Sequence, residues 1–133
     1  MSYGQESIQK AAEDFIRGEF KKEIALEHER AHTFPFELWK KTCELGLVSI
    51  HCPEQYGGHG CGVLENAPVV EAFCCQDSGL GIALSVADSS SEIILRYGNE
   101  EQKGRYLSVT TKGEAISSGA LTEPDHGIET PFK

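Results

Sequence analysis

The stretch DSGLGIALSVADSSSEIILRYGNEEQKGRYL, residues 77–107, contains three separate helix-start signals. The residues that carry these signals are Asp77, the pair Ser89 and Glu92, and the pair Asn99 and Gln102. A side-chain oxygen at such a position accepts a hydrogen bond from a free backbone N–H of the first turn, and an acid or amide three residues later completes a capping box. With Gly98 as a stop between the second and third signals, the stretch predicts three consecutive short helices.

The first of these helices, over residues 78–87, carries little side-chain bulk. Its small residues are Gly79, Gly81, Ala83, Ser85 and Ala87. Because glycine has no side chain, another part of the protein can approach its backbone closely. We therefore expect a second backbone or a ligand to pack against this helix.

Upstream, apolar residues recur at helical spacing. A single long amphipathic helix is predicted over about residues 5–31, with an apolar face formed by Ile8, Ala12, Phe15, Ile16, Phe20 and Ile24. Pro35 at a first helical position and Gly46 just past the end predict a second helix over 35–45. A third is expected from Val63, with Leu64, Ala67, Val70, Phe73 and Cys74 on its apolar side.

The segment LVSIHCPEQYGGHGCG, residues 47–62, has no sustained period and is predicted to be an ordered loop. It contains the residue types of a zinc site in His51, Cys52, His59 and Cys61, but not the usual spacing of two ligand pairs, so we expect no metal. The five cysteines form no C-x-x-C pair and are expected to be reduced. A thiol nucleophile is also disfavoured, because no strand-to-helix elbow is indicated.

After Gly113 the pattern changes. Residues 115–121, AISSGAL, predict a short extended segment that ends in a turn at Pro124 and Gly127. A lone strand cannot satisfy its ladder hydrogen bonds, so we expect its partners in residues outside this sequence. Glu123 either anchors the turn by accepting backbone hydrogen bonds or is an ordinary surface acid.

Length and charge limit the possible functions. A chain of 133 residues corresponds to about one domain. Twelve Lys and Arg against 21 Asp and Glu leave a net charge of −9, which disfavours nucleic acid and anionic membranes as partners. No apolar run approaches the roughly 18 residues of a membrane helix, and the N-terminus has neither a secretory nor an organelle signal, which predicts a cytoplasmic location.

Several separated blocks occur in one order along the chain. They are LGL at 45–47, PEQYGGHG at 53–60, YGNEEQKGRYL at 97–107 and LTEP at 121–124. Together they resemble the N-terminal domain of the flavin-dependent acyl-CoA dehydrogenases. The resemblance runs from about Pro35 to Gly127, and an ordered set of blocks is more specific than any single one.

The resemblance implies an all-α, up-down bundle-like domain over residues 1–114, with residues 115–133 beginning a middle β domain. The parent enzyme would oxidise an acyl-CoA thioester to the 2,3-enoyl-CoA with hydride transfer to FAD, and would pass electrons to an electron-transfer flavoprotein. It would commonly be a homo-oligomer. The family's catalytic carboxylate generally comes from a C-terminal helical bundle, so no catalytic residue is expected here and the chain alone is expected to be inactive.

Carried over by position, the resemblance implies flavin contacts at Leu121, Thr122 and Gly127, and contacts to the acyl or pantetheine part of the substrate at Leu84, Ser85 and Ile128. The chain departs from the family after the turn, where Gly127, Ile128 and Glu129 replace the common Gly-Ser-Asp. Ile128 cannot donate a side-chain hydrogen bond. This departure leaves a second hypothesis open, a stand-alone helical interaction module that has lost flavin binding.

Overall fold

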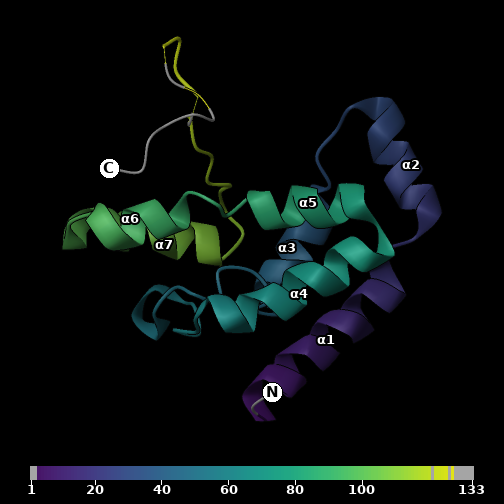
Figure 1. Ribbon diagram of the computed structural model, residues 1–133, viewed down its shortest axis with the longest axis horizontal. Coiled ribbons are helices and arrows are strands. Elements are labelled where there is room, and N and C mark those ends of the chain that lie inside the picture. Colours follow the sequence, from purple (N-terminus) through teal and green to yellow (C-terminus); the bar gives the residue numbers. More distant parts are fainter. Residues whose placement is uncertain (1–2, 121, 126, 128–133) are drawn as a thin grey trace.

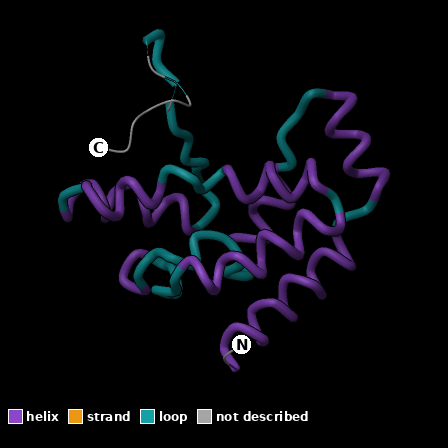
Figure 2. Tube along the Cα trace, viewed as in Figure 1, coloured by secondary structure: helices purple, strands orange, loops and turns teal. Residues whose placement is uncertain are grey.

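The computed structural model describes residues 3–120, 122–125 and 127, and Figure 1 shows its helices in sequence colours. They are α1 (Tyr3–Glu19), α2 (Lys22–Ala31), α3 (Phe36–Glu44), α4 (Val63–Gln76), α5 (Ser78–Val86), α6 (Ser91–Tyr97) and α7 (Glu100–Thr111), with a 3₁₀ turn η1 (Glu54–Tyr56). Within those described ranges the regular structure is helical, as Figure 2 shows, which confirms the predicted all-α class. None of these helices is both long and apolar enough to cross a bilayer.

The helices pack in two groups. α4 lies between α1 and α5, and α6 packs beside α7 (Figure 1). α3 contributes Trp39, which is only 1% exposed, to the shared core. The segment after α7 passes the junction of α5 and α6, where the Ser117 N–H donates to the Ala87 carbonyl at 2.9 Å.

An aromatic cluster joins α1 to α4. The ring centroid of Phe73 lies 6.2 Å from that of Phe15 and 5.6 Å from that of Phe20, and all three side chains are buried. Tilted and edge-on ring pairs at these separations add to the stabilisation that burial itself provides. The core of the protein is therefore centred on Phe73.

The predicted single helix over residues 5–31 is wrong at one point, because the chain bends after Glu19. Lys21 has extended backbone angles (φ −93°, ψ 138°) and α2 begins at Lys22. The bend follows Phe20, whose ring is buried in the aromatic cluster. α2 itself has no fully buried residue and extends away from α1 (Figure 1). Tertiary packing of one ring has overridden a continuous local pattern.

The buried side of α4 also differs from the prediction. Leu64 is 76% exposed, whereas Val69, Ala72 and Phe73 are buried. The physical reason is that α1 and α5 pack on the side of Val69, Ala72 and Phe73, so the buried face is displaced from the predicted stripe and leaves Leu64 outside it.

The small-residue prediction for residues 78–87 is confirmed. A Cβ atom at Gly81 would lie 2.7 Å from the backbone nitrogen of Cys74 and 2.8 Å from the carbonyl carbon of Phe73. Glycine at this position therefore allows the backbones of α4 and α5 to touch.

Two of the three predicted caps are present. Asp77 Oδ1 accepts from Leu80 N at 2.9 Å, and Asn99 with Gln102 forms a full capping box at 2.8 and 2.9 Å. The box predicted at Ser89 and Glu92 is wrong, because α6 begins at Ser91 and the preceding Ser90 makes no side-chain cap.

The extended segment predicted at 115–121 does not form a strand over its described residues 115–120. The physical reason is that no ladder partner lies beside it among the described residues, and its backbone hydrogen bond to the body of the protein there is the one from Ser117. Leu121 lies outside the described residues.

Candidate functional site

The loop over residues 47–62 folds back on Cys52. The Gly60 N–H donates to the Cys52 carbonyl at 2.7 Å, and a Cβ atom at Gly58 would overlap that carbonyl. Gly57 has φ +92°, a left-handed value that favours glycine. The predicted ordered loop is confirmed, and it places His51 and Cys52 against the helices.

Tyr56 connects this loop to α7. Its hydroxyl donates to Glu100 Oε2 at 2.8 Å, and the Thr111 hydroxyl donates to the Tyr56 carbonyl at 2.6 Å. The hydrogen bond from Tyr56 and the nearby Lys103 ammonium lower the pKa of Glu100 below its ordinary value of 4.5.

We expect Tyr56→Phe to lower the thermal midpoint at pH 7, because the Glu100 carboxylate loses a donor. A carboxylate whose pKa is lowered by folding contributes stability above its unfolded pKa and loses it as the pH falls through its folded pKa. The difference in midpoint between wild type and Tyr56→Phe should therefore shrink below pH 4.5. A difference that is the same at pH 7 and pH 3 would contradict this role for the Tyr56 hydroxyl.

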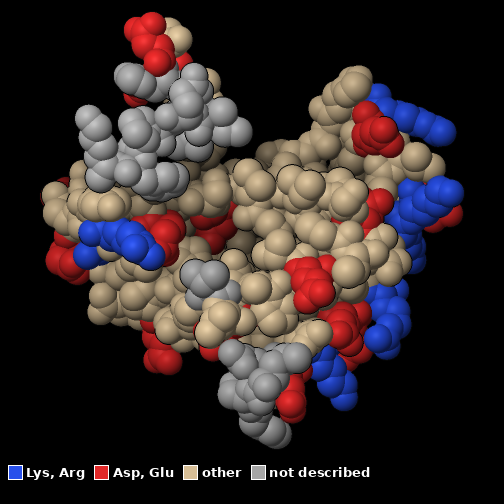
Figure 3. Space-filling model, in the orientation of Figure 1, with Lys and Arg blue, Asp and Glu red and all other residues tan. Residues whose placement is uncertain are grey.

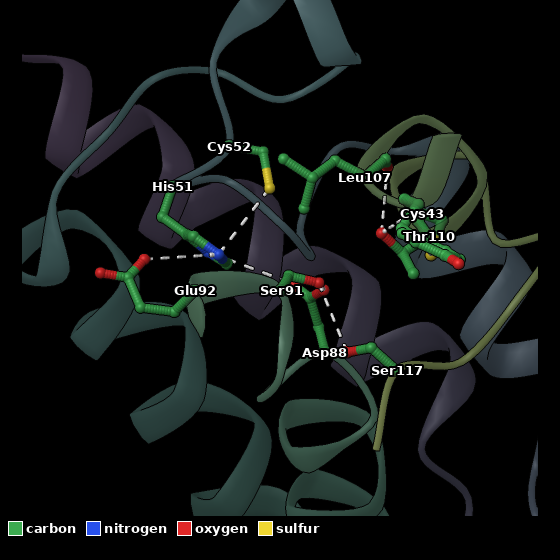
Figure 4. A network of polar contacts seen from close by, with 10 residues as sticks. Cys43, His51, Cys52, Asp88, Ser91, Glu92, Leu107, Thr110 and Ser117 are labelled. Carbon is green, nitrogen blue, oxygen red and sulfur yellow. Dashed lines mark hydrogen bonds and ion pairs between the residues drawn. The ribbon is translucent and has the colours of Figure 1, made fainter. Parts of the chain in front are cut away.

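A polar network lies where the loop meets the junction of α5 and α6 (Figure 4). His51 Nδ1 is 3.9 Å from Asp88 Oδ2, and His51 Nε2 is 3.8 Å from Glu92 Oε2. The Ser91 hydroxyl donates to Asp88 Oδ1 and lies 3.4 Å from the Ser117 hydroxyl. The imidazole thus lies between two carboxylates, one of which, Asp88, is buried.

Cys52 Sγ lies 3.8 Å from His51 Nε2, so cysteine, histidine and aspartate follow one another in space. Burial, assisted by the negative charge of Asp88, raises the pKa of Cys52 to about 12. Cys43 has its pKa raised to about 12 by the same causes. Because the thiolate is the nucleophile, this arrangement does not support thiol catalysis.

Alkylation with iodoacetamide at pH 8 tests whether burial keeps the thiols of Cys43 and Cys52 unreactive. We expect exposed Cys75 to react in the native chain while Cys43 and Cys52 stay unmodified, since a pKa raised from 9.0 to about 12 leaves about a thousandfold less thiolate. Intact-mass and peptide mass spectrometry would give the order of modification. Early labelling of Cys52 without unfolding would contradict the burial argument.

The histidines and cysteines of the 47–62 loop do not come together as a metal site. Cys61 Sγ contacts the His59 carbonyl oxygen at 3.8 Å, while the His59 ring lies against Gly46. Over the described ranges, no group of three or more His, Cys, Asp or Glu residues is arranged to hold a metal ion.

Three hollows border α5 in the described part of the chain: one of about 540 Å³ lies between α2 and the start of α5, and two lie near its last turn. Of these two, one is a cavity of about 190 Å³ beside the polar network, with Ser85 on its wall. The other is an open groove of about 400 Å³ between α5 and the segment after α7, lined in part by Ile82, Val86 and Ile116. Ile82 and Val86 are each 56% exposed, and the surface over α5 is formed mainly by uncharged residues (Figure 3).

The residues predicted for cofactor and substrate contacts are not all in one place. Ser85 lines the 190 Å³ cavity, but Leu84 is fully buried in the core behind it. Thr122 is exposed and Gly127 is half-buried, both on the terminal segment, while Leu121 and Ile128 lie outside the described residues. No sequence pattern indicated the network of His51, Asp88 and Glu92, because the loop and the α5–α6 junction are far apart in the chain.

Comparison with known proteins identifies a family and several relatives with similar sequences. Residues 2–114 match the family described as "Acyl-CoA dehydrogenase, N-terminal domain". The acryloyl-CoA reductase (NADH) of Anaerotignum propionicum is 38% identical over 125 residues, covering 94% of this chain and 32% of that protein. An acyl-CoA dehydrogenase of Bacillus subtilis is 36% identical over 126 residues, covering 94% and 33%.

Solved structures agree with these sequence relatives. A glutaryl-CoA dehydrogenase from Mycobacterium smegmatis in complex with FADH2 superposes with a TM-score of 0.82 and 32% identity, over 96% of this chain and 33% of that one. The butyryl-CoA dehydrogenase of Megasphaera elsdenii gives the same TM-score at 28% identity, covering 96% and 34%. The chain spans about a third of the length of the relatives that it matches.

Proposed function

The chain belongs to the acyl-CoA dehydrogenase family, within the N-terminal domain of that family, and from this premise we propose that it forms the N-terminal part of an FAD-dependent acyl-CoA dehydrogenase. The observation that carries the proposal is the match over residues 2–114 together with the shared helical arrangement. The parent enzyme oxidises an acyl-CoA thioester to the 2,3-enoyl-CoA and passes hydride to the flavin. Residues 1–114 form the helical domain and residues 115–133 begin a middle β domain.

In this proposal α5 supplies part of the wall of the acyl pocket. Its exposed apolar residues Ile82 and Val86 are available to cover an acyl chain or the domain that follows. Ser85 is at the wall of the separate 190 Å³ cavity, and Leu84 lies behind it in the core. In this family the carboxylate that removes the α proton generally comes from a C-terminal helical bundle, which is separate from the matched N-terminal domain.

The terminal segment carries hydrogen-bond donors of the kind that a flavin ring accepts. Thr122 is exposed, and its hydroxyl and backbone N–H are donors that match the carbonyl oxygens of an isoalloxazine ring. Leu121, Thr122 and Gly127 would hold the cofactor, which supplies the hydride acceptor when bound. Fixed donors at the ring stabilise the negative charge that it gains on reduction. Ile128 would lie beside the thioester arm of the substrate.

Electrons leave the parent enzyme to an electron-transfer flavoprotein. A structure described as the electron transferring flavoprotein of Acidaminococcus fermentans has a TM-score of 0.82 with this chain at 34% identity, which supports this partner. The parent enzyme assembles as a homo-oligomer.

The proposal is tested in a chimera. Residues 1–133 replace the matched N-terminal third of the Bacillus subtilis acyl-CoA dehydrogenase, and the purified product is expected to retain about one flavin per chain. Thr122→Val in the chimera should weaken flavin retention about tenfold, the effect of losing one well-made hydrogen bond to the ring.

Ser118→Ala is the matched control, since it removes an exposed hydroxyl from the same segment outside the proposed contact. A folded chimera without flavin would contradict the proposal. Equal effects of the two substitutions would remove Thr122 from the cofactor site.

A further inference from the structure

His51 lies where the 47–62 loop meets the α5–α6 junction, and each of its ring nitrogens faces a carboxylate (Figure 4). Nδ1 is 3.9 Å from Asp88 Oδ2, and Nε2 is 3.8 Å from Glu92 Oε2. A neutral imidazole has one N–H donor and one acceptor nitrogen, whereas the imidazolium has two donors. An acid at each nitrogen is therefore fully complementary only to the protonated ring.

Cys52 gives Nε2 an alternative partner within the loop. Its Sγ lies 3.8 Å from Nε2, the same separation as that of the Glu92 oxygen. Burial, assisted by the negative charge of Asp88, raises the pKa of Cys52 to about 12, so this side chain is a neutral thiol. A thiol is a weak donor, and an unprotonated ring nitrogen is an acceptor. The neutral ring can thus face Asp88 with an Nδ1 hydrogen while Nε2 accepts from the thiol.

The charges beside the ring attract a proton. The Asp88 side chain is 6% exposed and that of His51 19%, so solvent and salt screen this pair less than a surface pair. In the described part of the chain no lysine or arginine pairs with Asp88, and Arg96 pairs with Glu92. Two acids thus share one permanent cation. An imidazolium at His51 supplies the second positive charge, which lowers the cost of burying the Asp88 carboxylate.

The other helices around the ring add no charge to this balance. Within the described ranges, the cavity that His51 borders is lined from α4 by Asn66, Val69, Val70 and Phe73, and from α5 by Ser85. None of these side chains titrates. The charged groups that act on His51 at close range are therefore Asp88, Glu92 and, behind Glu92, Arg96.

We propose that His51 is a pH-dependent switch between the 47–62 loop and α6, in which Nε2 accepts from the Cys52 thiol at pH 8 and, once protonated, donates to Glu92. The proton comes from solvent, which reaches the partly exposed ring. Protonation brings both carboxylates to hydrogen-bond distance of the ring and draws the loop onto the first turn of α6, where Glu92 lies. The inference goes beyond the proposed function and stands on this chain alone.

The switch makes stability depend on pH. A histidine whose protonated form is favoured by folding contributes stability below its unfolded pKa of about 6.5 and loses it as the pH rises. The thermal midpoint of the wild type should therefore exceed that of His51→Gln by about 3 °C more at pH 5.5 than at pH 8.

His59→Gln is the matched control, because His59 is an exposed histidine of the same loop with no ion pair among the described residues. Its difference from the wild type should be the same at the two pH values. A pH-independent difference for His51→Gln, or an equal pH dependence in the two variants, would overturn the proposal.

NMR of the wild-type chain tests the partner exchange directly and does not depend on whether a variant folds. Long-range ¹⁵N–¹H spectra of the imidazole should show a hydrogen on Nδ1 alone at pH 8 and on both nitrogens at pH 5.5. The backbone amides of Glu92 and Arg96 should shift with the same midpoint. A ring that is still neutral at pH 5.5, or one with its hydrogen on Nε2 at pH 8, would overturn the proposal.

Glu92→Gln removes the acceptor of the protonated ring and should reduce the pH-induced amide shift at Arg96 by about twofold or more. Glu101→Gln removes an equal charge from an exposed position on α7 and should leave that shift unchanged. Equal shifts in the two variants would exclude Glu92 as the partner and overturn the proposal. None of these measurements uses flavin or CoA, so their failure is separate from failure of the proposed function.

Discussion

Gly81→Ala is expected to destabilise the chain by about 3 kcal/mol, even though alanine is the better helix former. The added Cβ would lie 2.7 Å from the backbone nitrogen of Cys74 and 2.9 Å from its Cα. These are backbone atoms of α4, so relief requires α4 and α5 to move apart and leaves part of the core unpacked. Urea unfolding followed by circular dichroism gives the free energy of unfolding.

Gly104→Ala is the matched control for this prediction. Gly104 also lies inside a helix, but a Cβ there has no neighbour within 4 Å. The same chemical change should therefore stabilise the chain by about 0.5–1 kcal/mol. If both substitutions stabilise, the close contact between α4 and α5 is not present in solution.

Phe73→Ala should remove about 3–5 kcal/mol, the cost of truncating a large buried aromatic residue. Phe73 is 1% exposed and contacts the rings of both Phe15 and Phe20, so its loss separates α1 from α4. Because domains of this size are stable by only about 5–15 kcal/mol, the variant should be substantially unfolded at moderate urea concentrations.

Phe36→Ala serves as the comparison for Phe73→Ala. Phe36 is 61% exposed and makes one edge-on ring contact with Phe34, so its truncation should cost about 1 kcal/mol. Equal losses of stability in the two variants would mean that Phe73 is not the centre of the core.

Local signals in the sequence were enough to predict much of the fold. The caps at Asp77 and Asn99 depend on residues within one turn, and both form as predicted. The small residues at 78–87 correctly indicated a close backbone approach, which Gly81 provides.

The failures share a tertiary cause. The apolar period continues through Phe20, yet the chain bends there because the ring is drawn into a cluster with residues from α4. The predicted box at Ser89 fails where Ser91 instead donates to a buried carboxylate. Neither event depends on neighbours in sequence, so local pattern alone does not indicate it.

For the candidate site too, linear features could be predicted from the sequence, whereas contacts between distant segments could not. The ordered blocks of the sequence indicated the family, because they are linear features. The polar network depends on His51 from the loop meeting Asp88 and Glu92 from the α5–α6 junction. That meeting is a property of the folded chain.

The central claim, that this chain is the N-terminal part of an acyl-CoA dehydrogenase, is tested most directly by flavin absorbance. Under anaerobic conditions the chimera with the Bacillus subtilis relative is mixed with a series of saturated acyl-CoA thioesters, with free CoA as the blank. Loss of the oxidised flavin band with at least one thioester, and none with free CoA, is the predicted result. A chimera that holds flavin yet stays oxidised with every thioester that reduces the unmodified relative would contradict the claim.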